Sequence, residues 1–196
     1  MKTLLISSSL FGANGQSTTL ANELAARLGG KVVVRDVTKV PHLDGERFAA
    51  FNTPAAARTP AQQAAAEYSD ELIAELKAAD AIVIGVPMYN FGIPSTLKAY
   101  FDHVARAGIT FKYTEKGAVG LLTGKKAYLV LARGGHYGDT HAHTSYVRDF
   151  LAFIGISDLE TVYAEGLAIS PASKDAGLAK ARAQIERLNE REPALI

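Results

Sequence analysis

The sequence has no cysteine, no cluster of basic residues and no long apolar run, and each absence narrows the possible functions. Without cysteine, disulfides, zinc ribbons and catalytic thiols are excluded, and the chain suits a reducing compartment. The formal net charge is only +1, so the basic stripe of a nucleic-acid-binding protein is missing. The N-terminal apolar run, Leu4–Ile6, is too short for a signal peptide, and no segment reaches the roughly 20 apolar residues of a membrane span. We therefore expect a soluble, cytoplasmic protein that binds neither nucleic acid nor a membrane.

Short apolar runs alternate with amphipathic stretches five times along the 196 residues. This alternation predicts an α/β fold with a doubly wound parallel sheet and helices on both faces. No linker or repeat divides the chain, so we expect residues 1–196 to form a single domain. The proline-containing stretch 41–58 is expected to be an irregular insertion, and loops of that length are usually functional or mobile. The expected strands are Thr3–Ser7, Lys31–Asp36, Asp80–Val86, Lys126–Leu131 and Thr161–Ala164, and the expected helices are Ser17–Leu28, Pro60–Ala78, Ser95–Ala105, Thr144–Ile154 and Lys174–Arg191.

The loop after the first expected strand, SSSLFGANGQST (residues 7–18), has the composition of a phosphate site. It leads into a helix N-terminus, where free N–H groups and a partial positive charge favour anions. Ser9, Gln16 and Ser17 add neutral donors, and Gly15 allows a tight turn. A simple capped turn is the alternative interpretation, and the position of the loop after the first strand favours the phosphate site.

The same loop lacks the residues of several other phosphate chemistries. It has no GK[ST] and no G-x-G-x-x-G, so it is neither a P-loop nor the usual dinucleotide fingerprint. No Asp or Glu follows the strand, which argues against a phospho-acceptor domain, and no Cys or Arg suggests a phosphatase. These absences favour a phosphate monoester that is held rather than transferred.

The loop after the third expected strand carries large apolar residues in a turn. Met88, Tyr89 and Phe91 lie between a strand and a helix start, where they cannot all face the core. Such side chains at the ligand edge of a sheet suggest a flat aromatic ligand. The Asn90 amide can bond to polar atoms of its ring. A hydrophobic plug at the sheet edge is the alternative.

The loop after the fourth expected strand, ARGGHYGD (residues 132–139), could meet the edge of such a ring. Gly134 and Gly135 would let the backbone approach closely, with N–H groups facing ring carbonyls. Arg133 and His136 could place positive charge near the ring, although His136 is equally well read as a solvated loop residue.

A metal site is not expected. His141 and His143 are two residues apart, which does not place them on one helix face, and no carboxylate lies at zinc-site spacing. We therefore interpret them as surface or pocket residues.

Together these loops resemble the bacterial family of FMN-dependent NADH:quinone oxidoreductases and azoreductases. The resemblance is carried by PMYNFGIPSTLKAYFDHVARAGITFKYTEKGAVGLLTGKKA, by the ARGG that follows, and by SDELIAELKAADAIVIGVPMYNF, FIGI and AEG. It extends from the first strand to about residue 170. It implies a flavodoxin-like sheet of five strands in the order 2-1-3-4-5 and a homodimer with one FMN per subunit near the interface.

The resemblance also assigns roles to individual residues. Two features depart from the family: Ala132 stands where a serine is common, and the 41–58 insertion has its own composition. The acceptor preference is therefore open. By position, the phosphate and ribityl chain would be held by Ser9, Gly15, Gln16 and Ser17, the ring by Met88, Tyr89, Asn90, Phe91, Ala132, Arg133, Gly134 and Gly135, and the acceptor by Tyr113 and Phe153 in a pocket shared between subunits. His136 is a further candidate for the acceptor pocket because of its place in the loop after the fourth strand.

The reaction expected from this resemblance is two-electron transfer from NADH or NADPH to a quinone or an azo compound by ping-pong exchange. The flavin carries the chemistry, so no catalytic side chain and no obligatory general base are expected. Two alternatives remain. One is a flavodoxin-type electron carrier, although such carriers tend to be strongly acidic and this chain is not. The other is a flavin-free structural or regulatory domain of the same fold.

Overall fold

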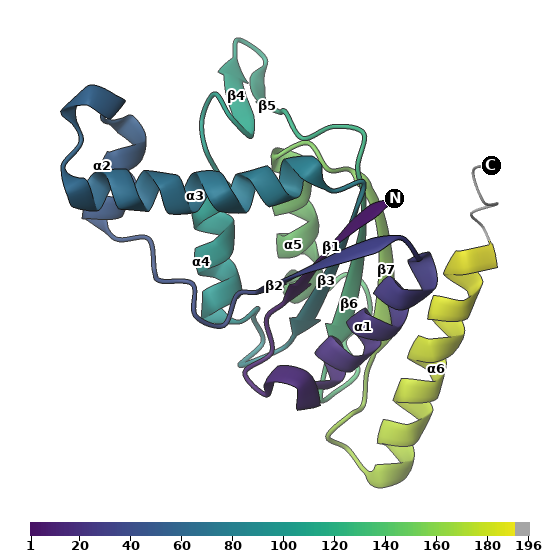
Figure 1. Cartoon of the computed structure of the whole chain (residues 1–196). Helices are drawn as coiled ribbons and strands as arrows, with labels where there is room; N and C mark the ends of the chain where they lie inside the picture. Colours follow the sequence, from purple (N-terminus) through teal and green to yellow (C-terminus); the bar gives the residue numbers. More distant parts are fainter. Residues whose placement is uncertain (191–196) are drawn as a thin grey trace.

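A five-stranded parallel sheet in the order β2-β1-β3-β6-β7 forms the centre of the computed structural model, which describes residues 1–190 (Figure 1). Every neighbouring pair in this sheet is parallel. Counted within the sheet alone, the order is 2-1-3-4-5, as expected. The strands are β1 (Lys2–Ser7), β2 (Lys31–Asp36), β3 (Ala81–Pro87), β6 (Lys126–Ala132) and β7 (Asp158–Ala164).

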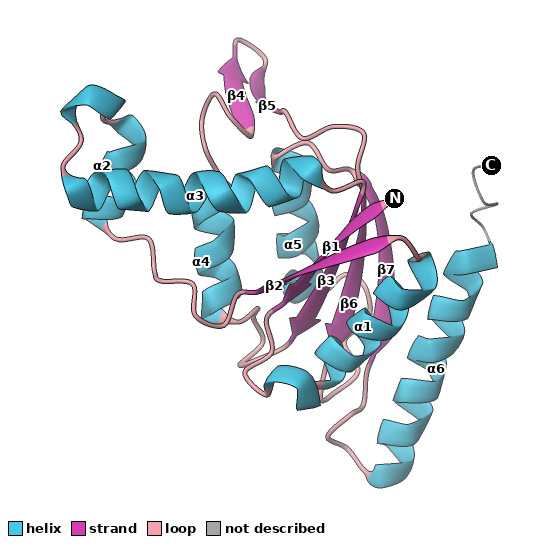
Figure 2. Cartoon of the chain, viewed as in Figure 1, coloured by secondary structure: helices cyan, strands magenta, loops and turns pink. Residues whose placement is uncertain are grey.

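Helices cover both faces of the sheet (Figure 2). Successive side chains of a strand point to opposite faces, so Leu4 and Ile6 of β1 join one core cluster and Leu5 joins the other. Among residues 1–190, no helix combines the length and apolar character needed to cross a membrane. The larger cluster is covered by α3 (Pro60–Ala78), α4 (Ser95–Val104) and α5 (Ala142–Phe153), and the smaller one by α1 (Gln16–Leu28) and α6 (Pro171–Glu190). Arg191, the expected end of the last helix, lies outside the described residues.

The insertion at 41–58 is partly helical, so the expectation of an irregular segment was wrong there. It contains α2 (Gly45–Asn52) and a 3₁₀ turn, η2 (Ala55–Ala57). The Asp44 carboxylate caps α2 by accepting the backbone N–H of Arg47 at 2.9 Å. An Asp at the N-cap is a strong local start signal.

A second difference is an antiparallel hairpin that the sequence analysis did not predict. It consists of β4 (Phe111–Thr114) and β5 (Gly117–Gly120). Its strands are four residues long and largely exposed, so they lack the apolar pattern of a core strand. The hairpin is anchored where Gly120 meets Gly155, because a Cβ at position 120 would lie 2.0 Å from the Gly155 nitrogen.

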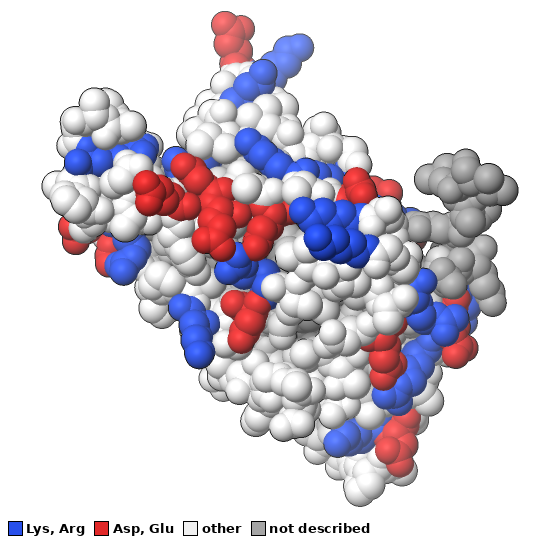
Figure 3. Space-filling model, viewed as in Figure 1, with Lys and Arg blue, Asp and Glu red and all other residues white. Residues whose placement is uncertain are grey.

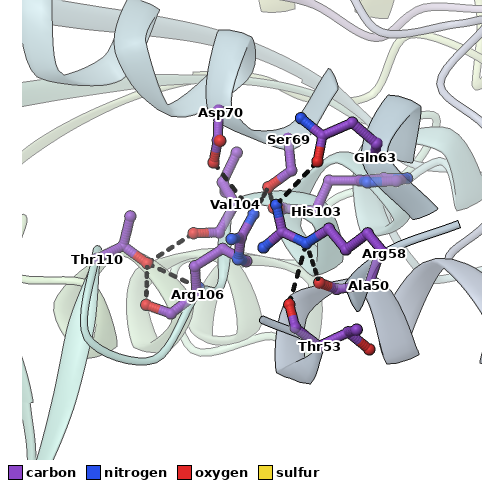
Figure 4. A network of polar contacts seen from close by, with 10 residues as sticks. All are labelled: Ala50, Thr53, Arg58, Gln63, Ser69, Asp70, His103, Val104, Arg106 and Thr110. Carbon is purple, nitrogen blue, oxygen red and sulfur yellow. Dashed lines mark hydrogen bonds and ion pairs between the residues drawn. The ribbon is translucent and has the colours of Figure 1, made fainter. Parts of the chain in front are cut away.

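Arg58 ties the end of the insertion back onto α2 (Figure 4). Its Nε donates to the carbonyl oxygens of Ala50 at 3.1 Å and Thr53 at 3.0 Å. These carbonyls belong to the last turn of α2 and to the residue after it, where helices leave acceptors unsatisfied. The guanidinium therefore caps the C-terminal end of α2, where a glycine cap is otherwise common.

Arg106 holds the insertion against α3 and α4 from the inside (Figure 4). Its side chain is only 6% exposed, and Nη1 donates to Ser69 Oγ at 2.8 Å and to Asp70 Oδ1 at 3.3 Å. Ser69 Oγ donates in turn to the His103 carbonyl at 2.6 Å. The guanidinium carbon also lies 4.2 Å from the ring centroid of Phe51 on α2. One cation thus connects three helices.

Replacing Arg106 with alanine should destabilise the protein clearly. The Arg106→Ala variant loses a charged hydrogen bond and a desolvated cation–π contact, so the free energy of unfolding should fall by about 2 kcal/mol. Urea denaturation measures this loss. Lys98→Ala on α4 is the matched control, because its exposed pair with Asp102 should contribute only about 0.3–0.5 kcal/mol. Equal losses in the two variants would contradict the central role of Arg106.

Candidate functional site

The loops that follow β1, β3 and β6 meet at the carboxyl end of the sheet (Figure 1). Hydrogen bonds connect them. The Tyr89 hydroxyl accepts the backbone N–H of Leu10 at 3.1 Å and lies 3.4 Å from Ser9 Oγ. The backbone N–H of Met88 donates to the carbonyl of Ala132 at 2.9 Å. The structure therefore brings the three predicted loops into one continuous surface.

The first turn of α1 presents free backbone donors. Its N-cap, Gly15, has no side chain to cap it, and within the described residues the N–H groups of Gln16, Ser17 and Thr18 donate to no protein acceptor. Residues 3–22 carry no charged side chain, and the surface over this turn is uncharged in Figure 3. Three aligned amides and the helix dipole favour an anion at this turn.

Ser17 adds a buried hydroxyl to these amides. Its side chain is 1% exposed, and its Oγ has no hydrogen-bond partner. A buried hydroxyl without a partner is costly, and an anion bound at the first turn of α1 would accept its hydrogen bond. Ser9 lies beside Gly15, and a Cβ at position 15 would fall 2.1 Å from Ser9 Oγ. The turn therefore needs glycine at position 15. Gln16 is half-buried at the mouth of the same turn.

The loop after β3 has an unusual backbone at its tip. Asn90 and Phe91 both have positive φ, 49° and 66°, and for a bulky residue such as phenylalanine this conformation costs roughly 1–3 kcal/mol. Tyr89 and Gly92 exchange two backbone hydrogen bonds, which fix the turn. The Phe91 side chain is 67% exposed. It is not packed as a hydrophobic plug, and the strained turn holds it at the surface.

Two backbone amides of the loop after β6 point away from the segment that follows β7. The carbonyls of Arg133 and Gly134 accept the N–H groups of Leu167 and Ala168 at 3.2 and 3.0 Å. No peptide bond of the described chain is cis, and a trans peptide points its N–H opposite to its carbonyl. The N–H groups that follow, those of Gly134 and Gly135, therefore point away from residues 167–168, and they donate to no acceptor among residues 1–190.

The Arg133 side chain differs from its expected placement at the ligand edge. It is fully buried and pairs with Glu165, with Nη1 to Oε1 at 3.0 Å. It also donates to the Gly138 carbonyl and to Thr144 Oγ1. The guanidinium is therefore engaged inside the protein, and its charge is neutralised there.

The histidines near this loop have different surroundings. His136 is exposed and lines a small hollow of about 230 Å³ with Tyr163 and Ser173, on the α6 side of the loop. His143, expected at a surface or pocket, is buried, with Nε2 3.2 Å from the Pro87 carbonyl. Burial lowers the pKa of His143 to about 4 despite the opposing hydrogen bond to Pro87. Within the part of the chain described, no three His, Cys, Asp or Glu residues are grouped to hold a metal ion.

Tyr113 and Phe153 are not brought to the three loops. Both rings contact Phe111, with centroids 5.4 and 4.4 Å away. This cluster lies at the β4–β5 hairpin, at the opposite end of the sheet from the β1–α1 loop (Figure 1). The Tyr113 side chain is 75% exposed. Within one chain these two residues therefore cannot share a pocket with the phosphate-type turn.

Glu165 and Thr144, which hold Arg133, were not among the residues expected at the site. The available signal for Glu165 was an acidic residue directly after the last strand, within the AEG stretch. Thr144 gave no signal, because only the fold brings it to Arg133. The Tyr89 hydroxyl was likewise read only as part of an apolar ring wall.

Comparison with known proteins finds relatives by both sequence and fold. A family model for the flavodoxin-like fold matches residues 1–188. An FMN-dependent NADH:quinone oxidoreductase of Cellvibrio japonicus is 57% identical, over 95% of this chain and 98% of its own. A second protein of that name, from Burkholderia lata, is 53% identical over 94% of this chain and 98% of its own. The crystal structure of an FMN-dependent NADH-azoreductase from Bacillus anthracis in complex with FMN is 27% identical, with a TM-score of 0.83 over 97% of this chain and 99% of that one.

The orphan hydroxyl of Ser17 gives a test of the anion site. Without ligand, Ser17→Ala should raise the free energy of unfolding by up to about 1 kcal/mol, because it removes a buried polar group that has no partner. Inorganic phosphate should stabilise the wild type and stabilise this variant less. Urea denaturation with and without phosphate measures both effects.

Ser8→Ala is the matched control for this variant. Ser8 is equally buried, but its Oγ donates to the Gly85 carbonyl at 2.7 Å. Its removal should cost about 1 kcal/mol with or without phosphate. If both alanine variants lose the same stability in the absence of ligand, the Ser17 hydroxyl is not reserved for an anion.

Proposed function

Because the chain belongs to the flavodoxin-like family of FMN-dependent NADH:quinone oxidoreductases, we propose that it transfers two electrons from NADH or NADPH to a quinone or an azo compound. It is an enzyme of this family, with FMN as its cofactor and NADH as its co-substrate. The observation that carries the assignment to its own residues is the buried, unpartnered hydroxyl of Ser17 below three free amides. We further propose that residues 1–196 form a single domain that acts in the cytoplasm.

The phosphate end of FMN fits the first turn of α1. The amides of Gln16, Ser17 and Thr18 and the Ser17 hydroxyl would hold the phosphate, and no acidic side chain in the first turn opposes it. Ser9 and Gln16 would bind the ribityl chain beside it. A phosphate monoester suits neutral donors at a helix end, because it is resident and its charge is stabilised by the dipole.

The ring end of FMN fits the other two loops. Met88, Tyr89, Asn90 and Phe91 would border the ring, and Ala132 and the amides of Gly134 and Gly135 would meet its pyrimidine edge. The support is that those two amides are free and that Phe91 is held at the surface by its backbone. Arg133 would act through the shape of the loop rather than by direct contact, because its guanidinium is buried and paired.

When bound, FMN supplies two-electron chemistry, taking a hydride from the nicotinamide and passing the electrons to the acceptor. The residues of this chain bind and orient. The glycine amides present donors to the electron-rich edge of the ring, and preorganised donors of this kind stabilise developing negative charge without reorganisation. Met88 and Phe91 would border the face where donor and acceptor bind in turn. This shared face makes the exchange ping-pong, and no side chain need act as a general base.

We propose that the acceptor pocket is completed by a second copy of the chain. Tyr113 and Phe153 lie at the opposite end of the sheet from the phosphate turn, so they could reach a flavin only in another subunit. Tyr113 is exposed on a short hairpin, where a partner could contact it. His136 is the weaker candidate, since it faces α6. A homodimer with two shared pockets follows.

The flavodoxin-type carrier is the less favoured alternative. Carriers that dock by charge are strongly acidic, whereas this chain has a formal net charge of +1. Aromatic side chains at the ligand edge also suit a small acceptor better than a protein partner.

The cofactor reaction can be followed by the visible spectrum. With FMN bound, addition of NADH without oxygen should bleach the flavin band, and a quinone should restore it rapidly. Binding of FMN without bleaching by NADH would favour the carrier. A protein that remains colourless after FMN addition would reject this use of all three loops.

The shared pocket predicts separate effects on acceptor and cofactor. Tyr113→Ala should raise the KM for the quinone roughly tenfold, the effect of losing about 1.4 kcal/mol of contact, and should leave FMN affinity unchanged. Steady-state kinetics and FMN titration measure the two quantities. Val34→Ala, at an exposed residue of β2, should change neither. A KM unchanged in the Tyr113 variant would remove that residue from the pocket.

A further inference from the structure

Glu165, the first residue after β7, gathers three donors on one carboxylate oxygen. Its Oε1 accepts Arg133 Nη1 at 3.0 Å, the backbone N–H of Tyr137 at 2.9 Å and that of Gly138 at 3.0 Å. The side chain is 15% exposed. A carboxylate that accepts two successive backbone amides fixes the direction of that stretch of chain, and charge-assisted hydrogen bonds of this kind are strong.

Arg133 completes the arrangement from the other side of the loop. Its side chain is fully buried and donates to the Gly138 carbonyl, to Thr144 Oγ1 on α5 and to Glu165. Its guanidinium carbon also lies 5.1 Å from the ring centroid of Tyr163 on β7. A buried charge of this kind is tolerated only when it is paired and hydrogen-bonded. The pair therefore joins β6, α5 and β7 to both ends of the segment 133–138.

This arrangement determines which amides of the loop remain free. Tyr137 and Gly138 give their N–H groups to Glu165, while those of Gly134 and Gly135 have no acceptor among residues 1–190. The Gly135 carbonyl also accepts the N–H of Gly166, the residue after Glu165, at 3.0 Å. Glycines have little intrinsic preference for one conformation, so these external contacts set the direction of the free amides.

We propose that Glu165 is a positioning residue for the flavin site: through Arg133, Tyr137 and Gly138 it holds the loop so that the amides of Gly134 and Gly135 face the ring. This proposal rests on the proposed function, because it assigns the ring edge to those amides. Glu165 does not contact the cofactor. It acts on ring binding and leaves the phosphate turn of α1, at the other end of the site, untouched.

The ionisation of Glu165 is consistent with this role. Burial by itself would raise its pKa, but the Tyr137 amide, the Arg133 guanidinium and the Gly138 amide outweigh that effect, so the pKa lies below its ordinary value. The carboxylate is therefore charged at neutral pH and balances the buried guanidinium.

The decisive experiment compares two ligands that differ only at the phosphate. Riboflavin has the ring of FMN without its phosphate, and the affinity of each is measured by titration into apoprotein. Glu165→Ala should weaken FMN and riboflavin by the same factor, about tenfold, the effect of losing one to two hydrogen-bonded groups. Glu165→Gln keeps an acceptor oxygen and should restore part of the loss. Ser17→Ala should weaken FMN and leave riboflavin unchanged.

Glu23→Gln is the matched control. Glu23 also accepts an arginine, with both oxygens bound by Arg182 at 2.9–3.3 Å, but this pair lies on α1 and α6. Its removal should leave both flavin affinities unchanged. Hydrogen exchange of the Tyr137 and Gly138 amides in the wild type gives a reading that needs no variant: both should be protected, and both should exchange faster in Glu165→Gln.

Each outcome separates the two proposals. A wild type that binds no FMN would reject the proposed function, while amide protection would still report whether Glu165 holds the loop. A wild type that binds FMN, with affinities within twofold in Glu165→Ala, would reject only the positioning role. The positioning role would also be rejected if Glu165→Ala weakened the binding of FMN but not of riboflavin, or if the amides of Tyr137 and Gly138 were unprotected in the wild type. If the alanine variant does not fold, the glutamine variant and the exchange measurement decide.

Discussion

Parallel pairing of β1, β3 and β6 is the constraint on which the site depends. It places the ends of these strands, and the loops that follow them, at one edge of the sheet. The apolar sequence of β3 stabilises this pairing, since every residue from Ala81 to Pro87 is buried. The helices that follow these strands begin at the same edge, so the N-terminus of α1 lies beside the loops after β3 and β6.

Several polar side chains of the core have hydrogen-bond partners, and free donors lie at the edge of the sheet where a ligand is expected. Ser8 is bonded to the next strand, and Arg106 and Arg133 have buried partners. By contrast, the first amides of α1, the Ser17 hydroxyl and the amides of Gly134 and Gly135 have no protein acceptor within residues 1–190. Unsatisfied donors are costly in a folded protein, and a polar ligand at this edge would satisfy several of them at once.

The charges are arranged to the same effect. The chain between Thr3 and Asn22 is uncharged, so these residues would stabilise an anion at the α1 turn through amides and the helix dipole. The one cation of the ring loops, Arg133, is neutralised by Glu165 inside the protein. The guanidinium therefore stabilises the backbone of the loop. Its position in the sequence had suggested a direct contact with the ligand.

Much of the fold and of the site could be read from the sequence, because the relevant signals are local. Apolar runs and glycine-rich turns identified the five sheet strands and their helices, and most element ends agree within three residues. They also located the three loops that the fold brings to one edge of the sheet. The hairpin β4–β5 was missed because its short, exposed strands carry no apolar pattern, and α2 was missed because its start depends on a single capping aspartate. The pairing of Arg133 with Glu165, 32 residues away, and the separation of Tyr113 from the phosphate turn were decided only by tertiary structure. The sequence by itself determined where the chain turns and which atoms it offers, whereas the direction in which those atoms point depends on distant partners that only the folded chain brings together.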